Sequence, residues 1–346
     1  MEGKNSVGVA VIGTGRIGQL HIENIIRFIP EAELMAIADV NPSSIEHVAK
    51  KFAIPTVSTD YLQLLDRSDI EAVVVCSSTD THAQIIQDSA QAGKHIFCEK
   101  PIDLDLERID QTLKIVDIAG VKLQIGFQRR FDMNFRHLKD LLLKDQIGQL
   151  HLLRITSRDP APPPIDYIKL SGGIFLDMMI HDFDMARFIT ESEVVKVYAS
   201  GAVLVDPNIG SVGDIDTAVV TLEFANGAIG SIDNSRQAVY GYDQRVEVLG
   251  SNGMLQAEND QKHTVAISKT DKIQRSSPPF FFLERYRMAY VDEIKSFIDS
   301  IRNDRVPLVT GEDGRAPVVI GLAAQHSLTE KRPVYLTEIE NMKSVS

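Results

Sequence analysis

One stretch decides the fold of this chain: Val9-Ala10-Val11-Ile12-Gly13-Thr14-Gly15-Arg16-Ile17-Gly18. An apolar run rich in β-branched residues enters a glycine-rich turn and leaves it into a helical pattern. The first glycine allows a sharp turn, the second lets a pyrophosphate approach the backbone, and the third lets the helix pack closely on the sheet. The start of that helix offers unpaired N–H donors and a partial positive charge to phosphates.

Asp39 makes this interpretation specific. A glycine triplet alone is a weak signal, but here a strand precedes it, a helix follows it, and an acid ends the next apolar run, Leu34–Asp39, about 20 residues further on. A carboxylate at that position accepts hydrogen bonds from the adenosine ribose and repels a 2′-phosphate. The sequence therefore predicts an NAD site rather than an NADP site, and disfavours a tight turn without a ligand.

Composition argues against two classes of function. The chain has 346 residues, 44% hydrophobic and 24% charged, as expected for a globular protein with two domains. A formal net charge of −12 without a basic patch disfavours nucleic acid as a partner. No apolar run is long enough to span a bilayer and no signal-peptide core precedes the first strand, so we expect a cytoplasmic protein without a membrane partner.

Two cysteines, Cys76 and Cys98, lie near the ends of apolar runs. Without a Cys-x-x-Cys motif or a second ligand cluster, we expect reduced, buried thiols rather than a disulfide or redox pair.

Residues 1–125 are predicted to form a Rossmann domain, a doubly wound parallel sheet, because strands and helices alternate there. Ligands on such sheets bind outside the carboxyl ends of the strands. The expected strands are Val7–Ile12, Leu34–Asp39, Ala72–Cys76, His95–Cys98 and Lys122–Ile125. The candidate cofactor-binding residues at their ends are Gly13, Thr14, Gly15, Arg16, Ile17, Gly18, Asp39, Ser77, Ser78, Thr79, His82, Glu99 and Lys100. For His82 the alternative is a purely structural role without contact to the cofactor.

Residues 126–346 show a different pattern and are predicted to form a substrate-binding and oligomerisation domain. A strand over 148–158, a proline-rich loop and a helix over Gly173–Thr190 precede several strands with period-two alternation. This order indicates an α+β domain with a mostly antiparallel open sheet and helices on one face. In Ala218–Phe224, alternation places Ala218, Val220, Leu222 and Phe224 on one side.

Lys100 is the first candidate for chemistry. It follows the strand His95–Cys98 within Glu99-Lys100-Pro101, where proline favours an extended backbone at Lys100. A lysine at this sheet edge can hydrogen-bond a substrate hydroxyl and lower its pKa. Taken alone, Lys-Pro is more typical of a solvated surface lysine.

Asp177 and His181 are the second candidates. They are four residues apart, so on an α-helix they share a face, and Asp184 lies on roughly the same side. A carboxylate beside an imidazole fixes its tautomer and stabilises its charged form, which suits general acid–base catalysis. The alternatives are a structural contact or a metal site of Asp177, His181 and Asp184. We expect no metal, because hydride transfer needs none and no other ligand cluster completes such a site.

These motifs together resemble the glucose–fructose oxidoreductase/inositol dehydrogenase/rhizopine catabolism (Gfo/Idh/MocA) family over nearly the whole chain. The resemblance rests on Gly13-x-Gly15-x-x-Gly18, Glu99-Lys100-Pro101 and Gly172-Gly173-x-x-x-Asp177-x-x-x-His181. Three further stretches are similar to its inositol dehydrogenases: Gly126–Asp132, Ser157–Pro160 and Tyr240–Asp243. Some of those enzymes carry Asn where Asp159 stands here, which bears on stereochemical preference and not on the reaction class.

The resemblance implies NAD-dependent oxidation of myo-inositol to 2-keto-myo-inositol, in inositol catabolism, by a homotetramer built through the second domain's sheet. It implies that Lys100, Asp177 and His181 form the catalytic group and also contact substrate. It further implies that the polyol faces Gln128, Arg129, Arg158, Asp159, Tyr240 and Tyr242. Without the family, Tyr240 and Tyr242 are edge-strand aromatics facing one side, and Arg129 and Arg130 are a solvated or salt-bridged pair.

Two rival functions remain open. One is a dehydrogenase for another cyclitol or sugar, such as scyllo-inositol, D-chiro-inositol or glucose. The other is a non-catalytic NAD-sensing regulator of the same fold. The intact set of Lys100, Asp177 and His181 favours an enzyme, because a sensor does not need all three.

Overall fold

The computed structural model describes residues 6–342, which divide into two compact units. Unit 1 holds the residues up to Phe131 together with Met288–Ala316, and unit 2 holds Asp132–Arg287 together with the residues from Pro317 onward. These units differ from the predicted division at residues 125 and 126 because Met288–Ala316 packs with unit 1. The domain roles assigned from the sequence stay a prediction.

Unit 1 contains the predicted parallel sheet, six strands in the order β3-β2-β1-β4-β5-β6. Its strands are β1 (Val7–Ile12), β2 (Ala32–Ala38), β3 (Val57–Ser58), β4 (Ala72–Val75), β5 (His95–Glu99) and β6 (Leu123–Gly126). Its helices are α1 (Arg16–Phe28), α2 (Pro42–Phe52), α3 (Leu62–Leu65), α4 (Thr79–Gln91), α5 (Leu106–Ala119), the 3-10 turn η1 (Gln128–Phe131) and most of α11 (Arg287–Arg302). All the strand pairs are parallel, which confirms the predicted doubly wound sheet.

The core of unit 1 explains why α11 belongs to it. Every residue of β1 and β4 is buried, as expected for parallel strands covered on both faces. Ile294, Phe297 and Ile298 of α11 join the same buried cluster as β1 and α1. The Gln124 side chain donates to the Glu293 carbonyl at 2.8 Å and links β6 to α11.

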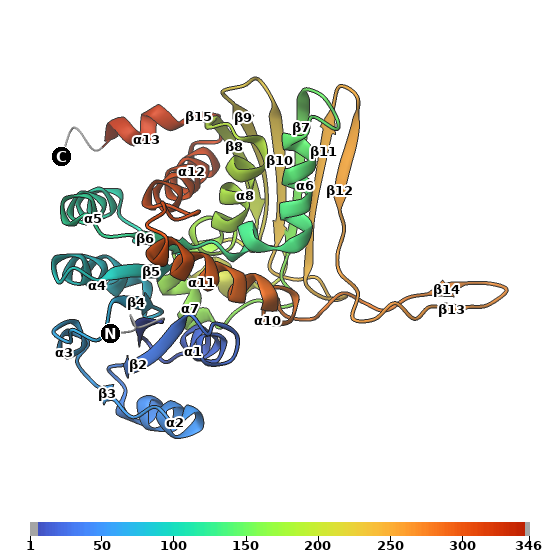
Figure 1. Ribbon diagram of the computed structural model, residues 1–346. Helices are drawn as coiled ribbons and strands as arrows, with labels where there is room; N and C mark the ends of the chain where they lie inside the picture. Colours follow the sequence, from blue (N-terminus) through green and yellow to red (C-terminus); the bar gives the residue numbers. More distant parts are fainter. Residues whose placement is uncertain (1–5, 343–346) are drawn as a thin grey trace. The chain divides into compact units, whose positions relative to one another are not determined.

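Unit 2 contains a mixed seven-stranded sheet in the order β12-β11-β7-β10-β9-β8-β15 (Figure 1). Its strands are β7 (Leu150–Arg158), β8 (Val194–Ala202), β9 (Thr217–Phe224), β10 (Ile229–Ser235), β11 (Asp243–Gly250), β12 (Gly253–Ala257) and β15 (Val334–Tyr335). Only β7 and β10 pair in parallel, so the expected mostly antiparallel sheet is confirmed.

Helices cover one face of this sheet, and the strands alternate accordingly. The helices α6 (Met133–Leu143) and α8 (Ile180–Thr190) contact β12 and β7. On β9, Ala218, Val220, Leu222 and Phe224 are buried while Val219 is half exposed, as the alternation predicted. The remaining elements are α7 (Ile165–Ser171), the π-helical turn η2 (Ile174–Met178), α9 (Pro207–Ser211), α10 (Phe282–Arg285), α12 (Gly311–Glu330) and α13 (Leu336–Met342).

A two-stranded hairpin, β13 (Ile267–Ser268) and β14 (Ile273–Gln274), extends away from the rest of unit 2 (Figure 1). Over residues 6–342, no helix is long and apolar enough to cross a membrane.

Candidate active site

The glycine turn between β1 and α1 has the space that a pyrophosphate needs. A Cβ on Gly18 would lie 1.9 Å from the Gly13 carbonyl oxygen, so only glycine allows this contact between helix and turn. A Cβ on Gly15, by contrast, would meet no atom within 4 Å. No side chain caps the start of α1. Open space beside uncapped N–H groups fits a phosphate at this helix end.

Asp39 is held in place as an acceptor directly after β2. Its Oδ2 accepts hydrogen bonds from the Thr14 N–H at 2.6 Å and from the Thr14 hydroxyl at 2.9 Å. Its Oδ1 accepts from the Asn41 N–H at 2.9 Å. These donors fix the carboxylate at the carboxyl edge of the sheet beside the glycine turn. The residues present therefore fit the adenosine ribose of NAD.

His82 joins the two other loops at this sheet edge. It is 2% exposed, and its Nδ1 lies 2.8 Å from the Pro101 carbonyl oxygen while its Nε2 lies 3.1 Å from the Ser77 carbonyl oxygen. Ser77 also contacts the Thr81 hydroxyl at 2.7 Å, and Ser78 and Thr79 begin α4. These contacts favour the structural interpretation of His82. Direct contact between the cofactor and this loop stays a prediction.

Lys100 follows β5 and is partly buried, next to Glu99. Glu99 Oε1 lies 2.7 Å from His21 Nε2 of α1, so the residue before Lys100 is fixed by a hydrogen bond. Gln128 and Arg129 lie in η1, just beyond the end of β6, and are both buried. Arg130 forms an ion pair with Asp313 at 3.0 Å, which agrees with the salt-bridged role considered for Arg129 and Arg130.

The helix predicted over Gly173–Thr190 is present, but its first part is a π-helical turn rather than an α-helix. Gly172 and Gly173 have φ values of 86° and 75°, and the π-helical turn η2 precedes α8. A Cβ on Gly173 would lie 2.7 Å from Asp214 Oδ1, which accepts a hydrogen bond from the Ile174 N–H at 3.1 Å. Asp177 therefore lies in a π-helical turn and His181 in α8, so the regular α-helical spacing assumed for the pair is not what the structure has, and their pairing stays a prediction.

Asp177 is nevertheless the centre of a polar cluster in unit 2. Its Oδ1 accepts a hydrogen bond from the Tyr167 hydroxyl at 2.8 Å, and its Oδ2 lies 3.6 Å from Arg236 Nη1. Arg236 is 1% exposed, and its Nη2 donates to Asp214 Oδ2 at 3.4 Å. One buried guanidinium thus spans two carboxylates, one of which leads into α8 and His181.

Tyr167, Asp214 and Arg236 were missed by the sequence interpretation. Tyr167 is 50% exposed overall, but partial burial raises its pKa well above its usual range, and the charges of Asp177 and Asp159 raise it further. Tyr167 therefore stays a neutral donor to Asp177. No sequence spacing indicates this group, because Tyr167 lies on α7, Asp214 follows α9 and Arg236 follows β10.

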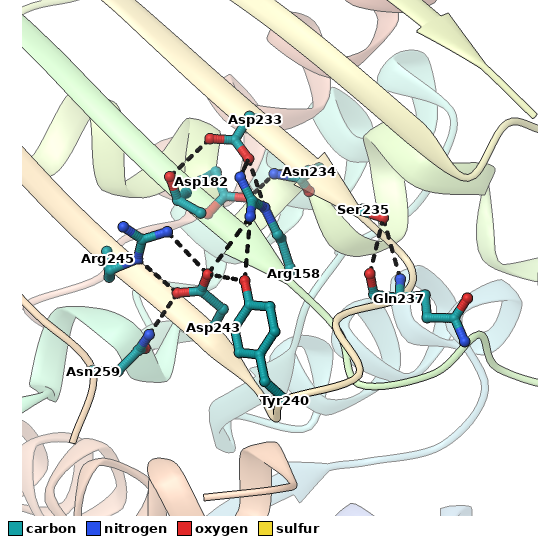
Figure 2. Close-up of polar contacts among 11 residues, drawn as sticks. Arg158, Asp182, Asp233, Asn234, Ser235, Gln237, Tyr240, Asp243, Arg245 and Asn259 are labelled. Atoms are coloured by element: carbon teal, nitrogen blue, oxygen red, sulfur yellow. Dashed lines mark hydrogen bonds and ion pairs between the residues drawn. The ribbon is translucent and has the colours of Figure 1, made fainter. Parts of the chain in front are cut away.

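Arg158 and Tyr240 lie together on the face of the unit 2 sheet that is opposite to α8 (Figure 2). Arg158 Nη2 and Nε contact Asp233 Oδ1 at 2.6 and 2.8 Å, and Arg158 Nη1 donates to the Tyr240 hydroxyl at 3.2 Å. Asn234, the next residue on β10, donates to Asp182 of α8 at 2.9 Å. Because neighbouring strand residues point to opposite faces, Arg158 and Asp233 lie on the face away from α8. Arg158 and Tyr240 thus contact each other and neighbouring carboxylates on this face, and their contact with the polyol stays a prediction.

Tyr240 and Tyr242 do not face one side, and that expectation is wrong. Both precede β11 in a turn, with Gly241 between them at a φ of 132°. Tyr240 is 47% exposed and donates to Asp243 Oδ2 at 2.6 Å, whereas Tyr242 is buried against Tyr286. The period-two rule does not hold because this segment is not a strand.

Burial raises the pKa of the Cys76 and Cys98 thiols, so both stay protonated, and both are free cysteines. Among residues 6–342, the side chains grouped closely enough to hold a metal ion are His21, Glu99 and Glu293. Within these residues, Asp177, His181 and Asp184, which the sequence offered as a metal site, are not grouped closely enough to hold a metal ion.

Comparison with family models identifies the chain. A model of the oxidoreductase family with an NAD-binding Rossmann fold matches residues 7–127, and a model of the GFO/IDH/MocA C-terminal domain matches residues 135–256. The chain belongs to the Gfo/Idh/MocA family. The resemblance inferred from the motifs, the oxidoreductase class and the NAD-binding fold are thereby confirmed.

Members of this family that are most similar to the chain include inositol dehydrogenases. The myo-inositol 2-dehydrogenase of Thermotoga maritima is 50% identical over 96% of this chain and 99% of that protein. The inositol 2-dehydrogenase of Rhizobium meliloti is 45% identical over 95% of this chain and 99% of that protein. The structure of scyllo-inositol dehydrogenase from Lactobacillus casei with bound NAD(H) and scyllo-inositol has a TM-score of 0.90 at 32% identity, covering 96% of this chain and 99% of that chain.

Proposed function

We propose that this oxidoreductase oxidises myo-inositol to 2-keto-myo-inositol with NAD. The observation that carries the proposal is the cluster in which Tyr167 and Arg236 hold Asp177 just before His181, in a chain half identical to a myo-inositol 2-dehydrogenase. A carboxylate oriented by a neutral phenol and a buried guanidinium is suited to positioning an imidazole for proton transfer.

Each member of the catalytic group has a separate role. His181 accepts the hydroxyl proton, Asp177 orients His181, and the Lys100 ammonium stabilises the developing alkoxide. When bound, NAD supplies the hydride acceptor. The glycine turn holds its pyrophosphate and Asp39 holds its ribose, as their geometry allows. No metal is needed for these steps.

The substrate class follows from the polar side chains assigned to the polyol. Gln128, Arg129, Asp159 and His181 supply both donors and acceptors, and Asp159 can accept from two neighbouring hydroxyls. A site for a sugar phosphate is expected to hold cations without a carboxylate. A second cyclitol, scyllo-inositol, stays a candidate substrate because a relative of known structure binds it.

We expect myo-inositol to be oxidised better than glucose, sorbitol or any sugar phosphate when NAD is the cofactor. The measurement is NADH formation across a substrate panel that includes scyllo-inositol and D-chiro-inositol. A sugar phosphate or an acyclic polyol that outperforms every inositol isomer would overturn the substrate assignment and leave the oxidoreductase class intact. Absence of NADH with every polyol, despite tight NAD binding, would favour a regulator.

Asp159→Ala and Tyr242→Phe are expected to raise the KM for myo-inositol more than the KM for NAD. Each change leaves a ring hydroxyl without a partner, at a cost of about 1–3 kcal/mol. Steady-state kinetics with each substrate varied in turn separates the two constants. Equal rises in both constants would remove these residues from the polyol site.

Asp39→Ser is expected to relax discrimination against NADP. The substitution removes the carboxylate that repels a 2′-phosphate, and loss of a charged hydrogen bond to ribose costs NAD about 1.5–3 kcal/mol. The ratio of kcat/KM for NAD and NADP measures the effect. Equal use of both cofactors by the unaltered protein would show that Asp39 does not face the 2′ position.

The active form is proposed to be a cytoplasmic homotetramer built through the open face of the unit 2 sheet. That face carries Leu152, Val219, Ile229 and Leu249, all 37–52% exposed, beside the Arg158 network. A row of apolar side chains next to charged groups is typical of an interface. Sizing with light scattering should give four copies, and a monomer at working concentration would contradict the proposal.

A further inference from the structure

Unit 1 contains a buried polar cluster that the proposed mechanism does not use. Its members are His21 of α1, Glu99 at the end of β5 and Glu293 of α11, and one ligand atom of each lies within 4.8 Å of the others. His21 Nε2 lies 2.7 Å from Glu99 Oε1 and 3.9 Å from Glu293 Oε1. His21 also packs against the rings of Phe97 and Tyr290.

Glu293 is the unusual member of this cluster. Its side chain is 0% exposed, and neither carboxyl oxygen has a hydrogen-bond partner. An ionised carboxylate in such a place costs several kcal/mol. Burial, with the nearby charge of Glu99, raises the pKa of Glu293 well above its usual value. This environment favours the neutral form of Glu293, which has an O–H to donate.

The geometry favours a proton over a metal ion at the centre of the cluster. Two ligands on one tetrahedral zinc ion, at about 2.0–2.2 Å from the metal, lie about 3.3 Å apart. His21 Nε2 and Glu99 Oε1 are closer than that, at the distance of a charge-assisted hydrogen bond. A metal would have to separate this pair and remove the proton from Glu293.

Glu99 is the acceptor on which this cluster converges. His21 Nε2 lies 2.7 Å from its Oε1, and Glu99 also lies within the group that Glu293 faces. The Cys76 thiol also faces Glu293, and the Cys98 thiol faces Glu99; burial keeps both thiols protonated. The O–H of Glu293 thus has a Glu99 carboxyl oxygen as its acceptor, directly or through one water molecule.

We propose that Glu293 is a positioning residue for Lys100: as a neutral acid it donates to Glu99 and, with His21, fixes the backbone from which Lys100 projects. The inference rests on the catalytic role proposed for Lys100. It assigns a function to the packing of α11 against the Rossmann sheet, because α11 supplies the donor and Gln124 anchors the helix at Glu293 itself.

Kinetics of two substitutions test the positioning role. Glu293→Gln keeps a neutral donor and is expected to hold kcat within about twofold, whereas Glu293→Met removes the donor and is expected to lower kcat about tenfold, the effect of one hydrogen bond. The dissociation constant for NAD should change in neither. Glu312→Met, at an exposed glutamate of the same unit, is the control. Equal kcat values for the Gln and Met variants, or a loss that falls on NAD binding, would overturn the proposal.

Unfolding measurements test whether Glu293 is protonated in the folded protein, and they do not depend on the substrate. A native pKa above the unfolded one means that folding takes up a proton, so stability is lost as pH rises from the usual glutamate value toward the native one. Compared with Glu293→Gln, the unaltered protein should unfold with an equilibrium constant that rises about tenfold per pH unit in that window. A pH-independent difference, or a metal ion that copurifies in equal amount with the chain, would overturn the neutral acid. If the pH slope appears but no polyol is oxidised, the proposed function fails and the proton assignment stands.

Discussion

His181→Ala lowers the turnover of myo-inositol by about 10²–10⁴-fold, the usual effect of removing a general acid–base group. The hydroxyl proton then has no acceptor as the hydride leaves the carbon. NAD affinity should change little, because the glycine turn and Asp39 belong to unit 1 whereas His181 belongs to unit 2. Turnover and NAD binding measured on the same preparation separate the two effects.

Lys100→Ala should give a loss of the same size, since the developing alkoxide loses its cation. His326→Ala is the matched control, because its imidazole is partly exposed on α12 beside Glu330. Near-normal turnover of His181→Ala would remove His181 from the mechanism. Activity should also persist in the presence of a chelator, and inhibition that added metal reverses would restore the metal site of Asp177, His181 and Asp184.

The parallel sheet could be predicted because its strands and helix ends are encoded locally. The strand Val7–Ile12 is a continuous apolar run, and the structure buries all of it. The helix Pro42–Phe52 begins where local signals place it, because proline opens it and the Asn41 side chain accepts from the N–H groups of Ser43 and Ser44. Such signals lie within a few residues of the element that they define.

The region around the catalytic pair could not be predicted in the same way. The backbone at Gly173 and Ile174 depends on Asp214, forty residues further along the chain. Tyr167 and Arg236 reach Asp177 only because α7 and the end of β10 meet there. The sequence motif identifies Asp177 and His181, but these distant contacts determine how Asp177 is held.

Long-range packing also decided the position of α11. An apolar face with Ile294, Phe297 and Ile298 indicates that the helix is buried somewhere. The pattern does not indicate which sheet covers that face. In the chain, α11 follows every strand of unit 2's large sheet except β15, yet the structure packs α11 in unit 1.

Arg236→Met is expected to lower the free energy of unfolding by about 3–5 kcal/mol, because it leaves the carboxylates of Asp177 and Asp214 without their buried cation. Turnover should fall as well, since Asp177 loses one of the groups that orient it. Denaturant unfolding gives the first effect and steady-state kinetics the second. Arg332→Met removes an ion pair between partly exposed side chains and should cost less than about 1 kcal/mol.

Two further variants show whether the two carboxylates explain the loss. Arg236→Lys keeps the charge, but one ammonium cannot replace a guanidinium whose Nη1 and Nη2 face different carboxylates, so it should recover only part of the stability. Adding Asp214→Asn to Arg236→Met removes one uncompensated charge and keeps an oxygen for the Ile174 N–H. The double variant should therefore be more stable than Arg236→Met alone but remain slow, because Asp177 still lacks its cation. Full recovery of turnover in that variant would show that Arg236 acts on the fold through Asp214 and not on Asp177.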